Sequence, residues 1–166
     1  MNADASQPVS VSRTIGAPAE ELFGFLADPA NHPLIDGSGM LREWSGGRIT
    51  AVGDVFTMAM HNDEMGDYEI ANHVVGYEQG RRISWEPVLK AASRPEDQGD
   101  IGQRSGHQWA YELTVLGPRS TLVTESYDCS RAPEWLRRAV RGGARWIASM
   151  NGTLERLDQL TGNQQG

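Results

Sequence analysis

The chain has 166 residues and a mass of 18.2 kDa, with 39% hydrophobic and 22% charged residues. This length predicts one domain with one core, and no run approaches the ~18 consecutive apolar residues of a membrane span, which excludes membrane insertion and fibrous classes. A formal charge of -7 repels phosphate backbones, so we expect no nucleic-acid partner. Residues 1–8 show no secretory signal, which indicates a cytoplasmic protein.

The N-terminal part of the chain predicts a strand, two helices and a second strand. Apolar and polar residues alternate over 9–15, which is typical of a half-buried strand. A helix begins at Ala17-Pro18, because proline suits a first helical turn, and ends near Asp28-Pro29. Residues 30–35 form a second short helix or turn, and residues 40–44 a strand.

The middle of the chain predicts five consecutive antiparallel strands. The alternating segments are residues 55–61, 68–77, 81–87, 109–115 and 121–128, separated by turns rich in glycine and polar residues. We therefore expect a sheet built mainly from hairpins.

A long polar stretch and the chain ends complete the expected organisation. Residues 88–106 are longer than a structureless connection usually is, so we expect a loop or lid there. We predict one ligand-binding domain over 9–161, with disordered ends at 1–8 and 162–166.

The last part of the chain predicts one long amphipathic helix. It begins at Pro133, and apolar residues including Trp135, Ile147 and Met150 recur at spacings of three and four. Gly142-Gly143 weakens the helix, so we expect a bend. A sheet of six to seven strands must curl around this helix, with the two short helices closing one end. This is an α+β helix-grip fold, which leaves room for a cavity.

Four segments resemble the SRPBCC superfamily, and specifically its polyketide cyclase/dehydrase and lipid-transport branch. They are RTIGAPAEELFGFLADPANHPLIDGSGMLRE, VGDVFTMAMHN, ANHVVGYEQGRRISWEP and LVTESYD, and the similarity covers roughly residues 9 to 160. The resemblance implies the helix-grip fold with a mostly apolar pocket on the concave face of the sheet. It does not imply one activity, because this superfamily includes aromatases, lipid carriers, hormone receptors, toxins and co-chaperone-like domains.

The alternation of side chains along each strand predicts which residues line this pocket. The final helix adds further members on its apolar stripe. The predicted ligand-binding residues are Phe56, Met58, Met60, Tyr68, Ile70, Asn72, Trp85, Trp109, Tyr111, Tyr127, Trp135, Ile147 and Met150.

Glu125 is the predicted catalytic residue. It shares the apolar face of its strand with Val123 and Tyr127, and a carboxyl group buried without a partner acquires the raised pKa that suits an acid or base near neutral pH. The alternatives are that Glu125 pairs with an arginine or a tyrosine hydroxyl, or faces solvent. Asn72 orients a ligand carbonyl or makes a structural hydrogen bond.

His32 and Asp36 are predicted gate residues at the pocket mouth, with a purely structural turn as the alternative for both. We interpret the segment from His61 to Asp67 as a solvated hairpin tip, because its spacing matches no metal motif. No metal and no cofactor are expected. His107 is predicted to face outward or toward the loop.

Three hypotheses for function follow. The first is binding of a hydrophobic or polycyclic small molecule, lipid-like or polyketide-like, in the internal cavity. The second is a cofactor-independent polyketide cyclase or dehydratase that uses Glu125 as acid or base. The third is a protein-interaction module, toxin-like or co-chaperone-like, which docks through the arginine-rich side of the last helix and has a filled core. A homodimer is compatible with each of them.

Overall fold

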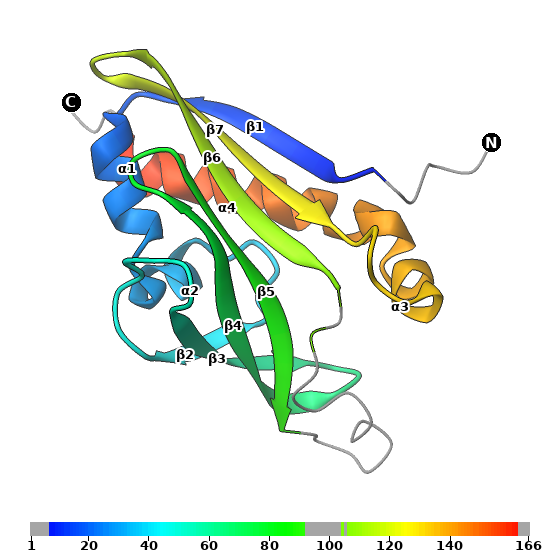
Figure 1. Ribbon diagram of the computed structural model, residues 1–166. Coiled ribbons are helices and arrows are strands. Elements are labelled where there is room, and N and C mark those ends of the chain that lie inside the picture. Colours follow the sequence, from blue (N-terminus) through cyan, green and yellow to red (C-terminus); the bar gives the residue numbers. More distant parts are fainter. Residues whose placement is uncertain (1–6, 92–103, 105, 163–166) are drawn as a thin grey trace.

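The computed structural model describes residues 7–91, 104 and 106–162, and its centre is a curved antiparallel sheet of seven strands (Figure 1). The order across the sheet is β1-β7-β6-β5-β4-β3-β2, so neighbours in sequence are neighbours in space except that β1 pairs with β7. The strands are β1 (Val9–Ile15), β2 (Leu41–Ser45), β3 (Val55–Asn62), β4 (Gly66–Glu78), β5 (Arg82–Ala91), β6 (Gln108–Gly117) and β7 (Ser120–Asp128). The predicted fold class is confirmed.

Three short helical segments follow β1 and cover one end of the sheet. Helix α1 (Ala19–Leu26) begins after Pro18 and buries Leu22, Phe23 and Leu26. The 3-10 helix η1 (Pro29–Asn31) is capped by Asp28, whose carboxylate accepts a hydrogen bond from the backbone N–H of Ala30 at 3.1 Å, and α2 (His32–Ile35) follows directly.

The C-terminal helix is broken into three segments. They are α3 (Glu134–Ala139), the 3-10 helix η3 (Arg141–Trp146) and α4 (Ile147–Thr161). The break lies at Gly142 and Gly143, whose φ angles of 65° and 101° belong to the left-handed region that favours glycine. Glycine is also required sterically, because a Cβ on Gly143 would lie 2.7 Å from a methyl carbon of Val9.

This break corrects two residue assignments. Trp135 and Ile147 are not part of the pocket wall: 57% of Trp135 and 39% of Ile147 is exposed to solvent. Spacings of three and four select one face only along a continuous helix, and the left-handed glycines reset the rotation of the chain between α3 and α4. On α3, Arg138 donates a hydrogen bond to Glu134 four residues earlier, at 2.7 Å.

Helix α4 packs against β1 and β7 and also contacts α2 (Figure 1). The main core lies between α1, the inner face of the sheet and the second half of α4, where Leu154 and Leu157 are fully buried. A smaller cluster surrounds Tyr127 and Met150 near the kink. The space between these two clusters holds the cavity described below.

The structure also bears on the predicted loop over 88–106. Strand β5 continues to Ala91, and Val88 forms a bridge with Arg104, so both ends of this stretch belong to the sheet region. The remainder of the proposed lid, like most of the predicted disordered ends, lies outside the described residues. Within the described residues, no helix combines the length and apolar character that crossing a bilayer demands.

Candidate functional site

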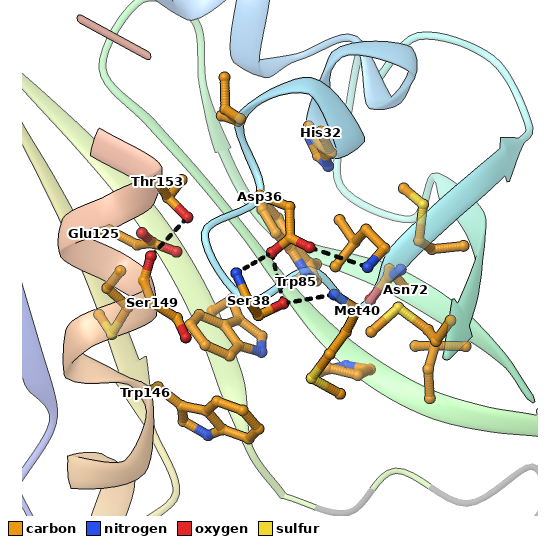
Figure 2. Close-up of a pocket in the computed structure, with 18 of the residues that line it drawn as sticks. His32, Asp36, Ser38, Met40, Asn72, Trp85, Glu125, Trp146, Ser149 and Thr153 are labelled. Carbon is orange, nitrogen blue, oxygen red and sulfur yellow. Dashed lines mark hydrogen bonds between the residues drawn. The ribbon is translucent and has the colours of Figure 1, made fainter. Parts of the chain in front are cut away.

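A cavity of about 230 Å³ lies between the sheet and α4, and its wall is mostly apolar (Figure 2). Strands β3 and β4 each supply alternate residues, as period-2 geometry requires. The lining residues that the sequence predicted are Phe56, Met58, Met60, Tyr68, Ile70, Asn72, Trp85, Trp109, Tyr111, Met150, Glu125, His32 and Asp36. The structure thus brings together side chains that lie more than 100 residues apart in the sequence.

Other wall residues come from outside the predicted strand faces. Ser38, Met40 and Leu41 belong to the loop after α2 and the start of β2, Pro87 to β5, and His107 precedes β6. Residues at the kink and on α4 complete the wall, namely Trp146, Ser149 and Thr153. The wall residues of this part of the chain recur at helical spacings of three and four; they are Trp146, Ser149, Met150 and Thr153. Their face of the helix lies beside the face that packs into the core, which ends in Leu154 and Leu157.

Tyr127 does not line the cavity, although its inward orientation was predicted. It is buried behind two indole rings, with its ring centroid 4.6 Å from that of Trp109 and 6.3 Å from that of Trp146. Its hydroxyl shares a 2.8 Å hydrogen bond with Nδ1 of His107. Of the two positions predicted for His107, the outward one is therefore wrong, because His107 lines the cavity. Burial lowers the pKa of His107 to about 4, so its imidazole is neutral at pH 7.

Glu125 lies on β7 between Tyr111 of β6 and Val11 of β1, and only 6% of it is exposed. The alternative that it faces solvent is therefore wrong. Its Oε1 atom has no hydrogen-bond partner, and no ion pair to it occurs in the part of the chain that the structure describes. Figure 2 shows it on the side of the cavity that α4 closes, near Ser149 and Thr153.

Burial raises the pKa of Glu125 to about 8. The nearby Tyr111 hydroxyl favours the carboxylate and opposes this shift, whereas the charge of Asp36 adds to it. The same surroundings raise the pKa of Tyr111 well above its ordinary value, with burial as the largest cause. At pH 7 the carboxyl group of Glu125 is therefore largely protonated and can donate a hydrogen bond or a proton.

Asp36 caps the loop that follows α2. Its Oδ1 accepts hydrogen bonds from the backbone N–H of Ser38 at 2.9 Å and the hydroxyl of Ser38 at 2.6 Å, and its Oδ2 accepts from the N–H of Leu41 at 3.0 Å (Figure 2). This is the turn that the structural alternative described. The loop is fixed to α4 because the N–H of Gly37 donates to Thr153, and a Cβ on Gly37 would overlap the carbonyl oxygen of Ser149.

His32 is held in an aromatic cluster at the inner wall. Its Nε2 donates to the carbonyl of Leu26 at 2.8 Å, and its ring stacks on Trp85 with centroids 5.4 Å apart. Phe56 meets both rings edge to face. Burial lowers the pKa of His32, which keeps the imidazole neutral at pH 7. These contacts fix the side chain, as in the structural alternative, rather than leave it free to move as a gate.

Glu86 is a further buried carboxylate, which does not line the cavity and connects three parts of the chain. Glu86 of β5 is buried and accepts hydrogen bonds from Arg104 at 3.0 Å and from Arg131 at 2.8 Å. Arg104 precedes β6 and Arg131 follows β7, so this ion-pair cluster fixes both chain segments beside His107. Sequence patterns gave no sign of it, because each partner lies at least 18 residues from Glu86.

No family model matches the chain. Over 125 residues the chain is 32% identical to an uncharacterized protein of Mycobacterium tuberculosis, a match that spans 72% of this chain and 46% of that protein. A second Mycobacterium tuberculosis protein, also named as uncharacterized, is 29% identical over 120 residues. The chain spans about half the length of the curated relatives it matches.

Solved structures share the fold. A protein from Mesorhizobium loti superposes with a TM-score of 0.61 at 23% identity, over 93% of this chain and 96% of the other. DynU16 from the dynemicin biosynthetic locus superposes with a TM-score of 0.58 at 17% identity, over 93% of this chain and 48% of DynU16. The Aha1 dimer from Colwellia psychrerythraea superposes with a TM-score of 0.57 at 14% identity, over 96% of this chain and 99% of the Aha1 chain. At these identities the comparison establishes the fold and carries no more.

Proposed function

We propose that this protein is a helix-grip protein of the SRPBCC type that binds a hydrophobic or polycyclic small molecule in its internal cavity. The observation that carries the proposal is the cavity itself: about 230 Å³ of space between the sheet and α4, walled mainly by aromatic, methionine and other apolar side chains. An unfilled apolar cavity costs stability, and a ligand of matching shape recovers the lost contacts. Methionine adapts to irregular apolar shapes, which suits a lipid-like or polyketide-like ligand.

Two of the structural neighbours bear on the choice between hypotheses. DynU16 comes from a biosynthetic locus, which accords with a small-molecule ligand, and the Aha1 neighbour is a dimer, which accords with a homodimer or a protein partner. The protein-interaction hypothesis expects a filled core, so the cavity favours the two ligand-binding hypotheses over it.

The first prediction concerns filling of this cavity. A neutral apolar dye, N-phenyl-1-naphthylamine, should bind the wild-type protein with an increase in fluorescence. Ile70→Trp adds bulk to a wall residue, and the dissociation constant of the dye is expected to rise by at least about tenfold. Val115→Trp is the matched control, because Val115 is exposed on β6. Equal affinity of the dye for both variants would contradict binding in the cavity.

A second candidate function is catalysis, and the specific observation for it is Glu125. A carboxyl group with a pKa of about 8 in an apolar cavity exchanges a proton readily near neutral pH, as an aldol-type cyclisation or a dehydration requires. Tyr111 lies next to Glu125 on the neighbouring strand and supplies a phenol hydroxyl beside the carboxyl group. In this function the cavity wall would fold the substrate, and Glu125 would move the proton.

The second prediction separates a carrier from an enzyme. Wild type and Glu125→Gln are purified from the same host, and native mass spectrometry measures the mass of any bound molecule. A carrier holds the same species in both proteins. An enzyme holds product in the wild type and unreacted substrate, of different mass, in the variant. Glu155→Gln on the exposed side of α4 is the control, and bare chain in every sample would contradict tight sequestration.

A further inference from the structure

The wall of the cavity carries acidic side chains and no basic ones. Among the described residues that line it there are two carboxyl groups, Asp36 and Glu125, and neither lysine nor arginine. The two lining histidines, His32 and His107, are both neutral at pH 7, because burial lowers the pKa of each. The charge available to a ligand in this cavity is therefore negative.

Aromatic faces give the same preference. Three indole rings line the cavity, from Trp85, Trp109 and Trp146, together with the phenol of Tyr111. The face of an indole attracts cations, and this attraction strengthens where water is excluded. An anionic headgroup would meet the like charge of Asp36 and no lysine or arginine among the described wall residues, so fatty-acid-like ligands are disfavoured, although the unpartnered indole N–H of Trp146 is a neutral donor.

Of the two carboxyl groups in the described wall, Glu125 is the one left for a ligand to bind. Asp36 already accepts three hydrogen bonds from its own loop, whereas Oε1 of Glu125 is buried with no partner. An unpartnered buried oxygen costs stability, so a donor on the ligand that reaches it gains a hydrogen bond, and this bond is charge-assisted once the carboxyl group has released its proton.

Among the residues that the structure describes, no cation faces Glu125 to take this place. Across the sheet its neighbours are Tyr111 and Val11, the loop after α2 brings Asp36, and the neighbouring α4 wall residues, Ser149 and Thr153, are hydroxyl side chains. Two arginines of the kink and α4 contact wall residues without lining the cavity themselves. Arg156 of α4 donates to the backbone oxygen of Asp36 at 2.5 Å, and Arg145 lies 5.4 Å from the ring centroid of Trp146 with 42% of its side chain exposed.

We propose that the ligand of this cavity is an apolar, ring-containing molecule with a protonated amine, and that Glu125 binds the amine as an ion pair among the three indoles. This inference rests on the proposed ligand-binding function. The amine keeps its proton, the carboxyl group of Glu125 releases its own to solvent, and the ion pair forms between the ammonium group and the resulting carboxylate. One proton thus leaves the protein for each carboxyl group that was protonated before binding.

Three naphthalene probes of similar size test this inference by calorimetry at pH 7. They are 2-naphthylmethylamine, 2-naphthylmethanol and 2-naphthoate, which are cationic, neutral and anionic. We expect the amine to bind about tenfold more tightly than the alcohol, and the naphthoate about tenfold more weakly. A pKa of about 8 leaves about 0.9 of the Glu125 carboxyl groups protonated at pH 7, so titrations in buffers of different ionisation enthalpy should show release of about 0.9 proton with the amine and none with the alcohol.

The variant experiment assigns the preference to one residue. Glu125→Gln should bring the affinity for the amine down to about that for the alcohol and abolish proton release, whereas the exposed control Glu155→Gln should behave as wild type. Equal binding of all three probes, or tightest binding of the alcohol or the naphthoate, would overturn the inference and leave the proposed function standing. Failure of every probe to bind would overturn the proposed function as well.

Discussion

Glu125→Gln is expected to increase the free energy of unfolding at pH 8 by about 4 kcal/mol. The carboxyl group has its pKa raised from 4.5 to about 8 in the folded protein by burial, so between these values the folded state retains a proton that the unfolded state has released. The unfolded state thus binds fewer protons, and stability falls by about 1.4 kcal/mol for each pH unit between 4.5 and 8. Glutamine is neutral in both states and removes this loss.

Urea unfolding at pH 5, 6, 7 and 8 measures the effect. The stabilisation by Glu125→Gln should be small at pH 5 and grow with pH, which distinguishes titration of Glu125 from a simple packing effect. Glu155→Gln is the control for loss of one carboxyl group at the surface. A difference between wild type and Glu125→Gln that stays constant across this pH range would contradict a buried, protonated Glu125.

Trp85→Ala is expected to decrease the free energy of unfolding by about 4 kcal/mol, the loss typical of a buried large-to-small substitution. Trp85 is 9% exposed and stands at the centre of the aromatic cluster. It stacks on His32, meets Phe56 edge to face, and lies 5.9 Å from Tyr111 between ring centroids. The lost contacts come from α2, β3 and β6 together, so no single neighbour can move to fill the space.

The matched control for this prediction is Trp44→Ala, because Trp44 lies on the edge strand β2 and is 44% exposed. Its replacement should cost about 1 kcal/mol or less. Both variants are compared by urea unfolding, with the slope of the transition used to confirm that the denatured states are alike. Equal losses in the two variants would show that the aromatic cluster does not hold the cavity wall together.

Burial of Glu125 lowers the stability of the protein but favours its proposed function. The same burial that costs stability at neutral pH leaves a carboxyl group ready to pair with a ligand or to move a proton, a compromise common at functional sites. A ligand that satisfied Glu125 would recover part of this cost. Ligand binding and pH should therefore be coupled in this protein.

The sequence by itself determined the strand faces and most of the cavity wall. A strand places successive side chains on opposite faces, so Phe56, Met58 and Met60 could be assigned to one side without knowledge of distant contacts. The inward position of Glu125 followed from the same rule applied to β7. Local patterns also predicted α1, the bend at Gly142-Gly143 and the turn at Asp36, because each depends on residues a few positions apart.

The tertiary structure alone decided what depends on contacts between distant elements. Because of the kink at Gly142 and Gly143, Trp135 lies away from the cavity wall and Trp146 is part of it. The helical period of 3.6 residues assigns side chains to one face only within a continuous helix, so it could not predict these positions across the break. The ion-pair cluster of Glu86 and the position of His107 depend on β5, β6 and β7 meeting in space. The raised pKa of Glu125 also depends on contacts between distant elements. Burial raises this pKa, and Asp36 and Tyr111 further influence it, and all three conditions exist only in the folded chain.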